Sequence, residues 1–423
     1  MKTTLTFLLV SFLAFAQQGD TKARAKGVRD LGKQGQEAIP KIAPYVSDPD
    51  LSVRIEAVKA LVEVGGPRTV DSLVKAASDN DPEIQIRAVD GLVNVYLPGY
   101  AKSGMSGTIQ RAGNSIKGRF TDTNDKVIDT FVEVRPDVIE AIGKLARGGA
   151  SVESRANAAR AVGVLRGRAA IPDLVEALHS KDDQVMYEAL VAIEKIRDPS
   201  AAPRIAFLLR DLDDKIQIAA LETTGILRNK DAAPDVRDAL SHARNIKVRR
   251  AAMTTLAMLG DAGDHEVFLR DLNDKDDAIR AAAAEGLARV KNSSDKAVVE
   301  KAFNDEKKMN PRLADAFALV AMGSTDTGEF SALRYLFNTL NQRIYRDVAV
   351  AYLTELCRDE NIRRAIYPML TGATKDEKIQ MSIVLARSGD KDSIPFLETL
   401  SVDPDGDVAR EGIRSLRTLR ARL

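Results

Sequence analysis

The stretch VRIEAVKAL, from Val53 to Leu61, decides the fold of this chain because the same pattern returns about every 31 residues. Ala57 lies four residues after Val53 and four before Leu61, so the three share one face of a helix with roughly 3.6 residues per turn. This helix has an apolar stripe with a small residue at its centre. A small side chain there lets a neighbouring helix approach closely.

We call the place of Ala57 the central position. It recurs almost to the C-terminus at spacings of 29 to 34 residues, with one exception of 70. The residues at this position are Gly27, Ala57, Ala88, Ala158, Ala189, Ala220, Ala252, Ala283, Asp315, Ala349, Ile383 and Gly412. A regular period of this length is typical of a solenoid, whose units pack only on their neighbours. The sequence therefore predicts an all-α solenoid, a right-handed superhelix of about eleven helical hairpins with one long insertion.

Each hairpin is predicted to consist of two helices joined by a short acidic turn. Proline opens first helices at Pro40, Pro172 and Pro395, because first-turn amides have no partner within the helix. Turns such as SDPD at 47–50 supply aspartate to cap the second helix. The predicted pairs are 36–65, 69–96, 136–166, 169–197, 200–228, 231–259, 263–290, 294–322, 327–357, 360–388 and 392–420.

A proline-opened helix, an Asp-rich turn and a helix of the form Val-Arg-x-x-Ala-Val-x-x-Leu together resemble the HEAT-repeat family. The similarity is greatest to its short bacterial branch, which includes phycobilin lyases, and it covers 20–420 apart from one insertion. The resemblance implies a scaffold or adaptor, because enzymes are occasional in this family. It also implies a ladder of arginines paired with turn aspartates of adjacent repeats, intact from Arg249 to Arg346 and broken between Gln85 and Gln217.

Two residues stand out within the repeats. Asp315 occupies a central position, where burying an acid is costly, so we expect a one-residue register shift onto Ala314 or Ala316. Cys357 is the only cysteine, which excludes an intramolecular disulfide, and we expect it to be a small buried hydrophobic residue.

The N-terminus does not follow the repeat. Lys2 precedes an apolar run from Leu5 to Phe15, and Ala14-Phe15-Ala16 has the small-x-small form of a cleavage site. We expect 1–16 to be a signal peptide cleaved near Ala16, with export to the periplasm or the extracellular space. An uncleaved anchor is the rival interpretation, but the run is about half of the roughly 20 residues that a membrane span needs. Residues 17–35 then form an N-terminal capping helix.

The spacing of 70 places an insertion at 97–135, between repeats over 36–96 and 136–423. Its first half is basic and rich in glycine, and its second half is acidic. The functional interpretation is a partner-binding patch made of Tyr96, Tyr100, Lys102, Arg111, Lys117, Arg119 and Phe120. The alternative is a decoration whose basic half pairs with its own acidic half.

No pattern indicates catalytic, metal or cofactor chemistry. His265-Glu266 is similar to the HE pairs of HEAT-like deoxyhypusine hydroxylases, but that family uses several such pairs and this chain has one. The string DPDGD at 403–407 opens like a calcium loop, yet Arg414 stands at its twelfth position, where a glutamate is required. We therefore interpret it as a turn and helix cap, and predict no catalytic residue, metal or cofactor.

Charge balance limits the classes of partner. The chain has 62 basic and 61 acidic residues, so no global field favours nucleic acid. We predict an exported, non-enzymatic scaffold that binds a protein or peptide on the concave face formed by the second helices. The alternatives are peripheral association with a membrane surface through the basic insertion, and a lyase-like enzyme of the short HEAT branch.

Overall fold

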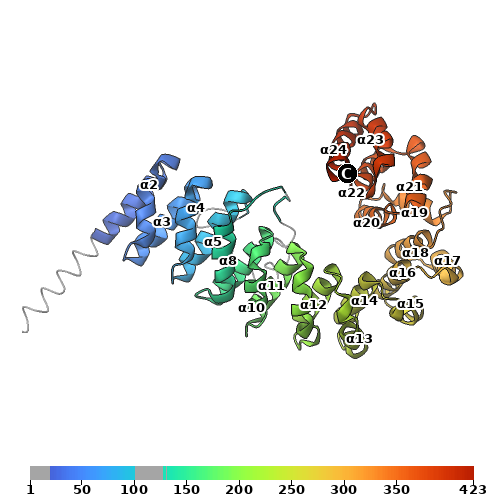
Figure 1. Cartoon of the computed structure of the whole chain (residues 1–423), viewed down its shortest axis with the longest axis horizontal. Coiled ribbons are helices and arrows are strands. Elements are labelled where there is room, and N and C mark those ends of the chain that lie inside the picture. The colour runs from blue at the N-terminus through green and yellow to red at the C-terminus, as the bar shows by residue number, and fades with distance from the viewer. Residues whose placement is uncertain (1–19, 101–126, 130) are drawn as a thin grey trace, which may run out of the picture. The chain divides into compact units, whose positions relative to one another are not determined.

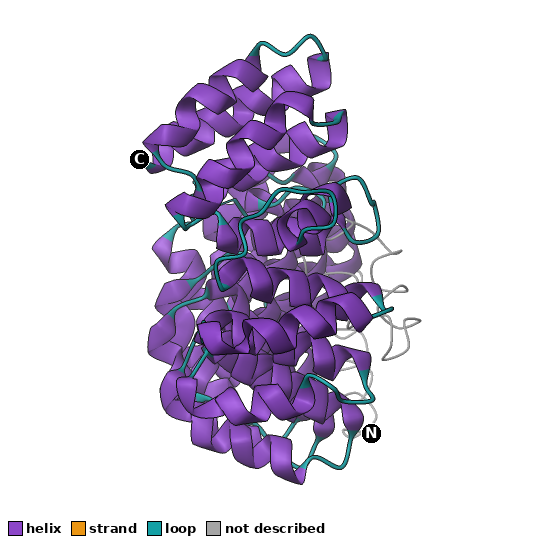
Figure 2. Ribbon diagram, turned by 90° about the vertical axis from the view of Figure 1, so that its right-hand side faces the viewer, coloured by secondary structure: helices purple, strands orange, loops and turns teal. Residues whose placement is uncertain are grey.

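The computed structural model describes residues 20–100, 127–129 and 131–423, and these residues form helices and turns without a β-strand (Figures 1 and 2). They group into two compact units, one ending at Leu227 and the other running from Arg228 to Leu423. Each unit is a stack of helical hairpins, and the described residues contain eleven, which we number in chain order. The predicted all-α solenoid is confirmed.

The first unit begins with a single helix over 20–32 and continues with hairpins 1 to 5. Hairpin 1 pairs η1 (Gly35–Ala38), α2 (Ile39–Ile42) and η2 (Ala43–Ser47) with α3 (Leu51–Val64), and hairpin 2 pairs η3 (Pro67–Thr69) and α4 (Val70–Ala77) with α5 (Pro82–Tyr96). Hairpin 3 pairs α8 (Pro136–Gly148) with α9 (Val152–Val164), and hairpin 4 pairs η4 (Arg168–Ala170) and α10 (Ile171–Ala177) with α11 (Asp183–Ile196). Hairpin 5 pairs η5 (Pro199–Arg204) and η6 (Ala206–Arg210) with α12 (Asp214–Ile226).

The second unit consists of hairpins 6 to 11. Hairpin 6 pairs η7 (Lys230–Ala232) and α13 (Ala233–His242) with α14 (Ile246–Leu259), and hairpin 7 pairs η8 (Ala262–Asp264) and α15 (His265–Asp271) with α16 (Asp277–Val290). Hairpin 8 pairs η9 (Ser293–Asp295) and α17 (Lys296–Asp305) with α18 (Met309–Ala321), and hairpin 9 pairs α19 (Ala332–Thr339) with α20 (Arg346–Leu356). Hairpin 10 pairs α21 (Glu360–Ile366) and η10 (Tyr367–Gly372) with α22 (Lys375–Ser388), and hairpin 11 pairs η11 (Lys391–Ser393) and α23 (Ile394–Ser401) with α24 (Gly406–Arg422).

Within each unit, second helices pack on each other in order, and most also pack on the first helix of their own hairpin. The alanines at their central positions, among them Ala57, Ala158 and Ala283, are 0% exposed. At the central position of α24, a Cβ built on Gly412 would lie 2.7 Å from the Leu400 backbone of α23, the first helix of the same hairpin. A small residue there lets the two helices of a hairpin approach closely. The alanine repeat of the sequence thus lies in the buried core of the hairpins.

Turn aspartates cap the second helices as expected. The side chain of Asp50 accepts from the Ser52 amide, and that of Asp276 accepts from the amides of Ala278 and Ile279. In the DPDGD string, Asp405 accepts from the amides of Asp407 and Val408, which is the predicted turn-and-cap role.

Asp315 corrects an expectation. It is 3% exposed in α18, with Ala314 and Ala316 fully buried on either side, so the predicted register shift that would spare the acid is wrong. Helix α18 is covered on nearly all sides, and no one-residue rotation would bring this side chain to solvent. Burial raises the pKa of the Asp315 carboxyl to about 8, so the folded protein holds it protonated at neutral pH and avoids burying a charge.

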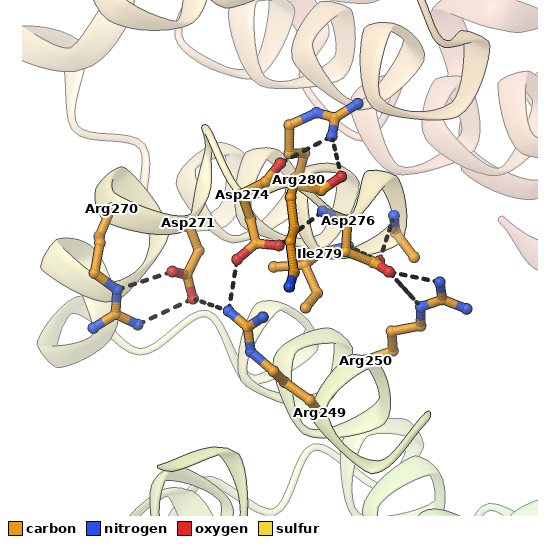
Figure 3. A network of polar contacts seen from close by, with 10 residues as sticks. Arg249, Arg250, Arg270, Asp271, Asp274, Asp276, Ile279 and Arg280 are labelled. Carbon is orange, nitrogen blue, oxygen red and sulfur yellow. Dashed lines mark hydrogen bonds and ion pairs between the residues drawn. The ribbon is translucent and has the colours of Figure 1, made fainter. Parts of the chain in front are cut away.

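The arginine ladder of the second unit is largely as predicted. Arg249 pairs with Asp274 at 2.7 Å, and Arg280 pairs with Glu306 of the next turn at 2.7 Å. Figure 3 shows the turn of hairpin 7, where Asp274 and the capping Asp276 receive arginines from α14. Each rung joins a second helix to the turn of the following hairpin and so holds neighbours in register.

The ladder is interrupted at Arg312, contrary to the expectation of an intact run up to Arg346. The next turn contains Asn341 and Gln342 instead of an acid. The Arg312 guanidinium lies over the rings of Phe303 and Tyr335, with centroids 5.0 and 4.9 Å away. Cation–π contacts thus replace the missing ion pair.

The arginine ladder is broken in the first unit at both Gln85 and Gln217, as predicted. The Gln85 side chain donates to the Asp79 carbonyl at 2.6 Å and accepts from the Ala150 amide at 2.9 Å. Gln217 donates to the Leu209 carbonyl at 2.8 Å. Neutral hydrogen bonds to the backbone take the place of ion pairs there.

Candidate partner-binding surface

A second set of polar pairs lies on the second helices of the first unit. Each joins the residue two after a central position to the residue one before the next central position. Arg29 pairs with Glu56 at 2.9 Å, Asn157 donates to Asp90 at 3.2 Å, and Arg160 pairs with Glu188 through its Nε at 3.0 Å. We call these three pairs the inner ladder. The Asp90–Asn157 rung shows that hairpin 3 stacks directly on hairpin 2, although 39 residues of insertion separate them.

The inner ladder is partly desolvated. Glu188 is 2% and Asp90 is 6% exposed. Arg160 contacts both carboxylate oxygens of Glu188, the geometry that makes an arginine–carboxylate pair strong. Removing one partner of such a pair leaves the other charge buried and costs about 3–5 kcal/mol.

The first end of the insertion lies against this ladder. Tyr100 makes a side-chain hydrogen bond with Arg160, and burial raises the pKa of the Tyr100 phenol to about 12. The phenol is therefore neutral at physiological pH and acts as a hydrogen-bonding group. Of the predicted patch, Tyr100 is the residue that the structure brings onto the inner ladder.

The C-terminal end of the insertion lies against hairpins 2 and 3. The Ile128 amide donates to the Val164 carbonyl at the end of α9 at 3.0 Å, and Ile128 is 3% exposed. The Tyr96 hydroxyl accepts from the Arg135 amide at 3.3 Å. Both described ends are thus attached to the repeats. The other predicted patch residues, Lys102, Arg111, Lys117, Arg119 and Phe120, lie outside the described residues.

Two glutamates add negative charge further along the second helices. Burial raises the pKa of Glu194 in α11. Burial also raises the pKa of Glu222 in α12, and the neighbouring Glu194 raises it further. Their mutual repulsion would be relieved by a cationic group of a partner.

The cysteine and two of the histidines, residue types that are often reactive, are buried or held in structural contacts. Cys357 is 0% exposed, and burial raises its thiol pKa to about 12, which makes the thiolate inaccessible and agrees with the predicted buried hydrophobic role. His265 bonds Asp295 at 2.6 Å, and His179 stacks on Phe207. Among the described residues, no group of three or more His, Cys, Asp or Glu could hold a metal ion, and no helix is long and apolar enough to cross a membrane.

Sequence reasoning missed the inner ladder. Its signal is present in the repeat, because polar residues recur two after and one before the central position, as at Asp90 and Asn157.

Comparisons with known proteins agree with this architecture. The model of the family of HEAT repeats matches residues 9–93, 139–206 and 201–288, which is more than half of the chain. No curated protein sequence matches.

Several solved structures are similar. They include an engineered protein (18% identity, 90% of this chain and 98% of that one, TM-score 0.39), the complex of CpcE and CpcF of phycocyanin lyase from Nostoc (19%, 66% and 94%, 0.35), and YibA of E. coli (16%, 70% and 94%, 0.42). At these scores the similarities carry no statement about activity.

The helical hairpins, their buried central alanines and the arginine ladder define an α-solenoid. With the family match over more than half of its length, the chain belongs to the HEAT-repeat family.

Proposed function

We propose that this chain is an exported, non-enzymatic scaffold that binds a protein or peptide partner on the second helices of its first unit. HEAT-repeat proteins generally bind protein partners, and the inner ladder is the observation that supports this surface. Its side chains pair with one another and hold neighbouring second helices in fixed register, so a partner would meet a preorganised surface. The predicted basic patch of the insertion adds positive and aromatic groups beside it.

Site-specific photocrosslinking tests the surface. A photoreactive amino acid is placed at Lys59, on the second helix of hairpin 1, and at the exposed Glu222 in α12, each two residues after a central position. The matched controls are Lys41 and Lys144, which lie on first helices. We expect partner adducts from the second-helix positions in an envelope extract and none from the controls. Adducts from Lys41 and Lys144 alone would place the partner on the other face.

The role of the insertion is tested separately. A chain lacking 97–135 should retain the helical signal, because the Asp90–Asn157 rung already joins hairpins 2 and 3. We expect it to lose or weaken the adducts. Undiminished adducts would remove the insertion from the site, and sedimentation with anionic liposomes that depends on the insertion would favour the membrane alternative.

Export is tested by the mature N-terminus. Cleavage after Ala16 predicts a protein that begins at Gln17 in the periplasm or the medium. Recovery of an intact Met1 in the cytoplasmic fraction would contradict export.

A further inference from the structure

One ion pair in the second unit connects hairpins that are not neighbours. Arg289 of α16 donates to Glu355 of α20 through Nε at 3.0 Å and through Nη2 at 2.9 Å. These helices belong to hairpins 7 and 9, and α18 of hairpin 8 lies between them in the stack. The rungs of the arginine ladder described above, in contrast, join adjacent hairpins.

A second contact crosses the same gap. The Tyr352 hydroxyl of α20 donates to Glu285 of α16 at 2.7 Å, and Glu285 also receives Arg289 at 3.1 Å. We call Glu285, Arg289, Tyr352 and Glu355 the inner bridge. It joins α16 and α20 by two independent contacts.

The inner bridge rests on the helix that it crosses. The ring of Phe317 in α18 stacks on that of Tyr352 with centroids 4.6 Å apart, and the Arg289 guanidinium lies 5.5 Å from the Phe317 centroid. The Arg289 side chain is only 16% exposed and also donates to the Ala257 carbonyl of α14. The bridge is therefore packed and partly dry, so solvent and salt screen it weakly.

Geometry links the bridge to curvature. Two helices separated by a third are about 16–20 Å apart when three helices pack side by side in a flat layer. Arg289 and Glu355 can meet over α18 only if the layer bends toward the side on which they lie. Tyr352 assists, because it stands three residues after a central position, where the other hairpins carry residues as small as Ala192 or Gly286.

We propose that the inner bridge is a conformational latch that holds hairpins 7 to 9 bent and fills their second-helix face with the protein's own side chains. Loss of the bridge lets α16 and α20 separate and opens that face. Contact with a partner that competes for Glu355 or Arg289 would do the same. The bridge lies in the second unit, so its test is independent of partner binding by the first.

Distance measurement between spin labels tests the latch in the full-length chain. Labels are attached at Lys291→Cys and Arg358→Cys, exposed positions at the ends of α16 and α20, while Cys357 is buried and should take up no label. We expect a single narrow distance distribution in the unaltered background. Arg289→Gln should lengthen the mean distance and broaden the distribution.

Two further variants make the result decisive. Tyr352→Phe keeps the stacking on Phe317 and removes only the hydroxyl, so it should broaden the distribution with little effect on folding. Arg249→Gln removes an ordinary rung of the arginine ladder and should leave the distance unchanged. Unchanged distances in Arg289→Gln and Tyr352→Phe proteins with unaltered helical signal would overturn the latch, as would equal broadening by Arg249→Gln.

Discussion

Single residues decide how this protein responds to pH. Asp315 and His265 both have a raised pKa, for opposite reasons: burial disfavours the charged form of Asp315, whereas the hydrogen bond to Asp295 favours the charged form of His265. The buried Asp315 therefore destabilises the fold increasingly as pH rises, whereas the contact of His265 with Asp295 stabilises the fold only at low pH.

We expect Asp315→Ala to stabilise the second unit. The folded pKa of about 8 exceeds the ordinary value of 3.8, so between these values the unfolded state alone releases the proton and stability falls as pH rises. Alanine restores the central residue of the repeat. The gain should be small near pH 4 and reach on the order of 2–5 kcal/mol at pH 8.

Urea unfolding at several pH values measures this gain. Asp315→Asn serves as control, since it removes the titration but keeps a buried polar group. A gain that does not change with pH would show that Asp315 is not protonated in the folded state.

His265 should stabilise the contact between hairpins 7 and 8 at low pH. The imidazolium bonds Asp295, and its raised pKa means that this contribution is complete below the ordinary value of 6.5 and is lost as pH rises through the folded pKa. His265→Gln should cost at most about 1 kcal/mol at pH 5, because the side chain is partly exposed, and close to nothing at pH 9. Denaturation at the two pH values measures the cost. Asp295→Asn should reproduce it, and a loss of equal size at both pH values would disagree with this account.

At the scale of elements, second helices end in an unusual way. Several close with a left-handed residue, and at Arg166, Arg197, Arg228 and Lys291 this residue carries a side chain. Gly260 has the same conformation with φ 61° after α14. A cation at the end of a helix interacts favourably with the free carbonyls, which offsets part of the left-handed strain.

Arg197→Gly should therefore stabilise α11. Glycine removes the steric cost of φ 56° but also the charge at the helix end, so we expect a net gain of about 0.5–1 kcal/mol. The reverse change, Gly260→Ala, should destabilise by a similar amount. Thermal unfolding monitored by circular dichroism measures both, and a destabilised Arg197→Gly protein would mean that the arginine charge outweighs the strain.

At the scale of the whole molecule, hairpin 11 differs from the other hairpins in one exposed face of its second helix, α24. Ile413, one residue after the central position of α24, is 44% exposed, whereas its counterparts Val58, Leu190 and Met253 are 0% exposed. Arg417, five residues after the central position, stands where Val93 and Val320 are buried in other second helices. In α24 an arginine thus stands where other second helices bury an apolar side chain, which keeps this exposed face polar.

We expect Arg410→Ile with Arg417→Val to promote self-association. The two changes, with Ile413 between them, create an apolar face on α24. Sedimentation velocity should show oligomers that increase with concentration. Arg364→Val, which adds an exposed apolar residue on the first helix α21, is the control. A double variant that stays at the molecular mass of the unaltered protein would contradict the view that the two arginines keep this face of α24 from associating.

The sequence by itself determined the hairpins, because the information for them is local. The alanine period, the proline at first helices and the turn aspartates act within a few residues, and each was confirmed where the structure describes it. The arginine ladder was implied by the resemblance to the HEAT-repeat family, and pairs such as Arg249 with Asp274 confirm it in the second unit. It failed at Arg312, where the following turn has no acid.

Tertiary structure alone decided which side chains meet across the second helices. The inner ladder depends on the rotation of each helix against the next, and the contact of Arg289 with Glu355, 66 residues apart, depends on how strongly the stack bends. The burial of Asp315 depends on neighbours that cover α18 on almost every side. Curvature and helix rotation are summed over many small packing contacts, so no short stretch such as VRIEAVKAL encodes them.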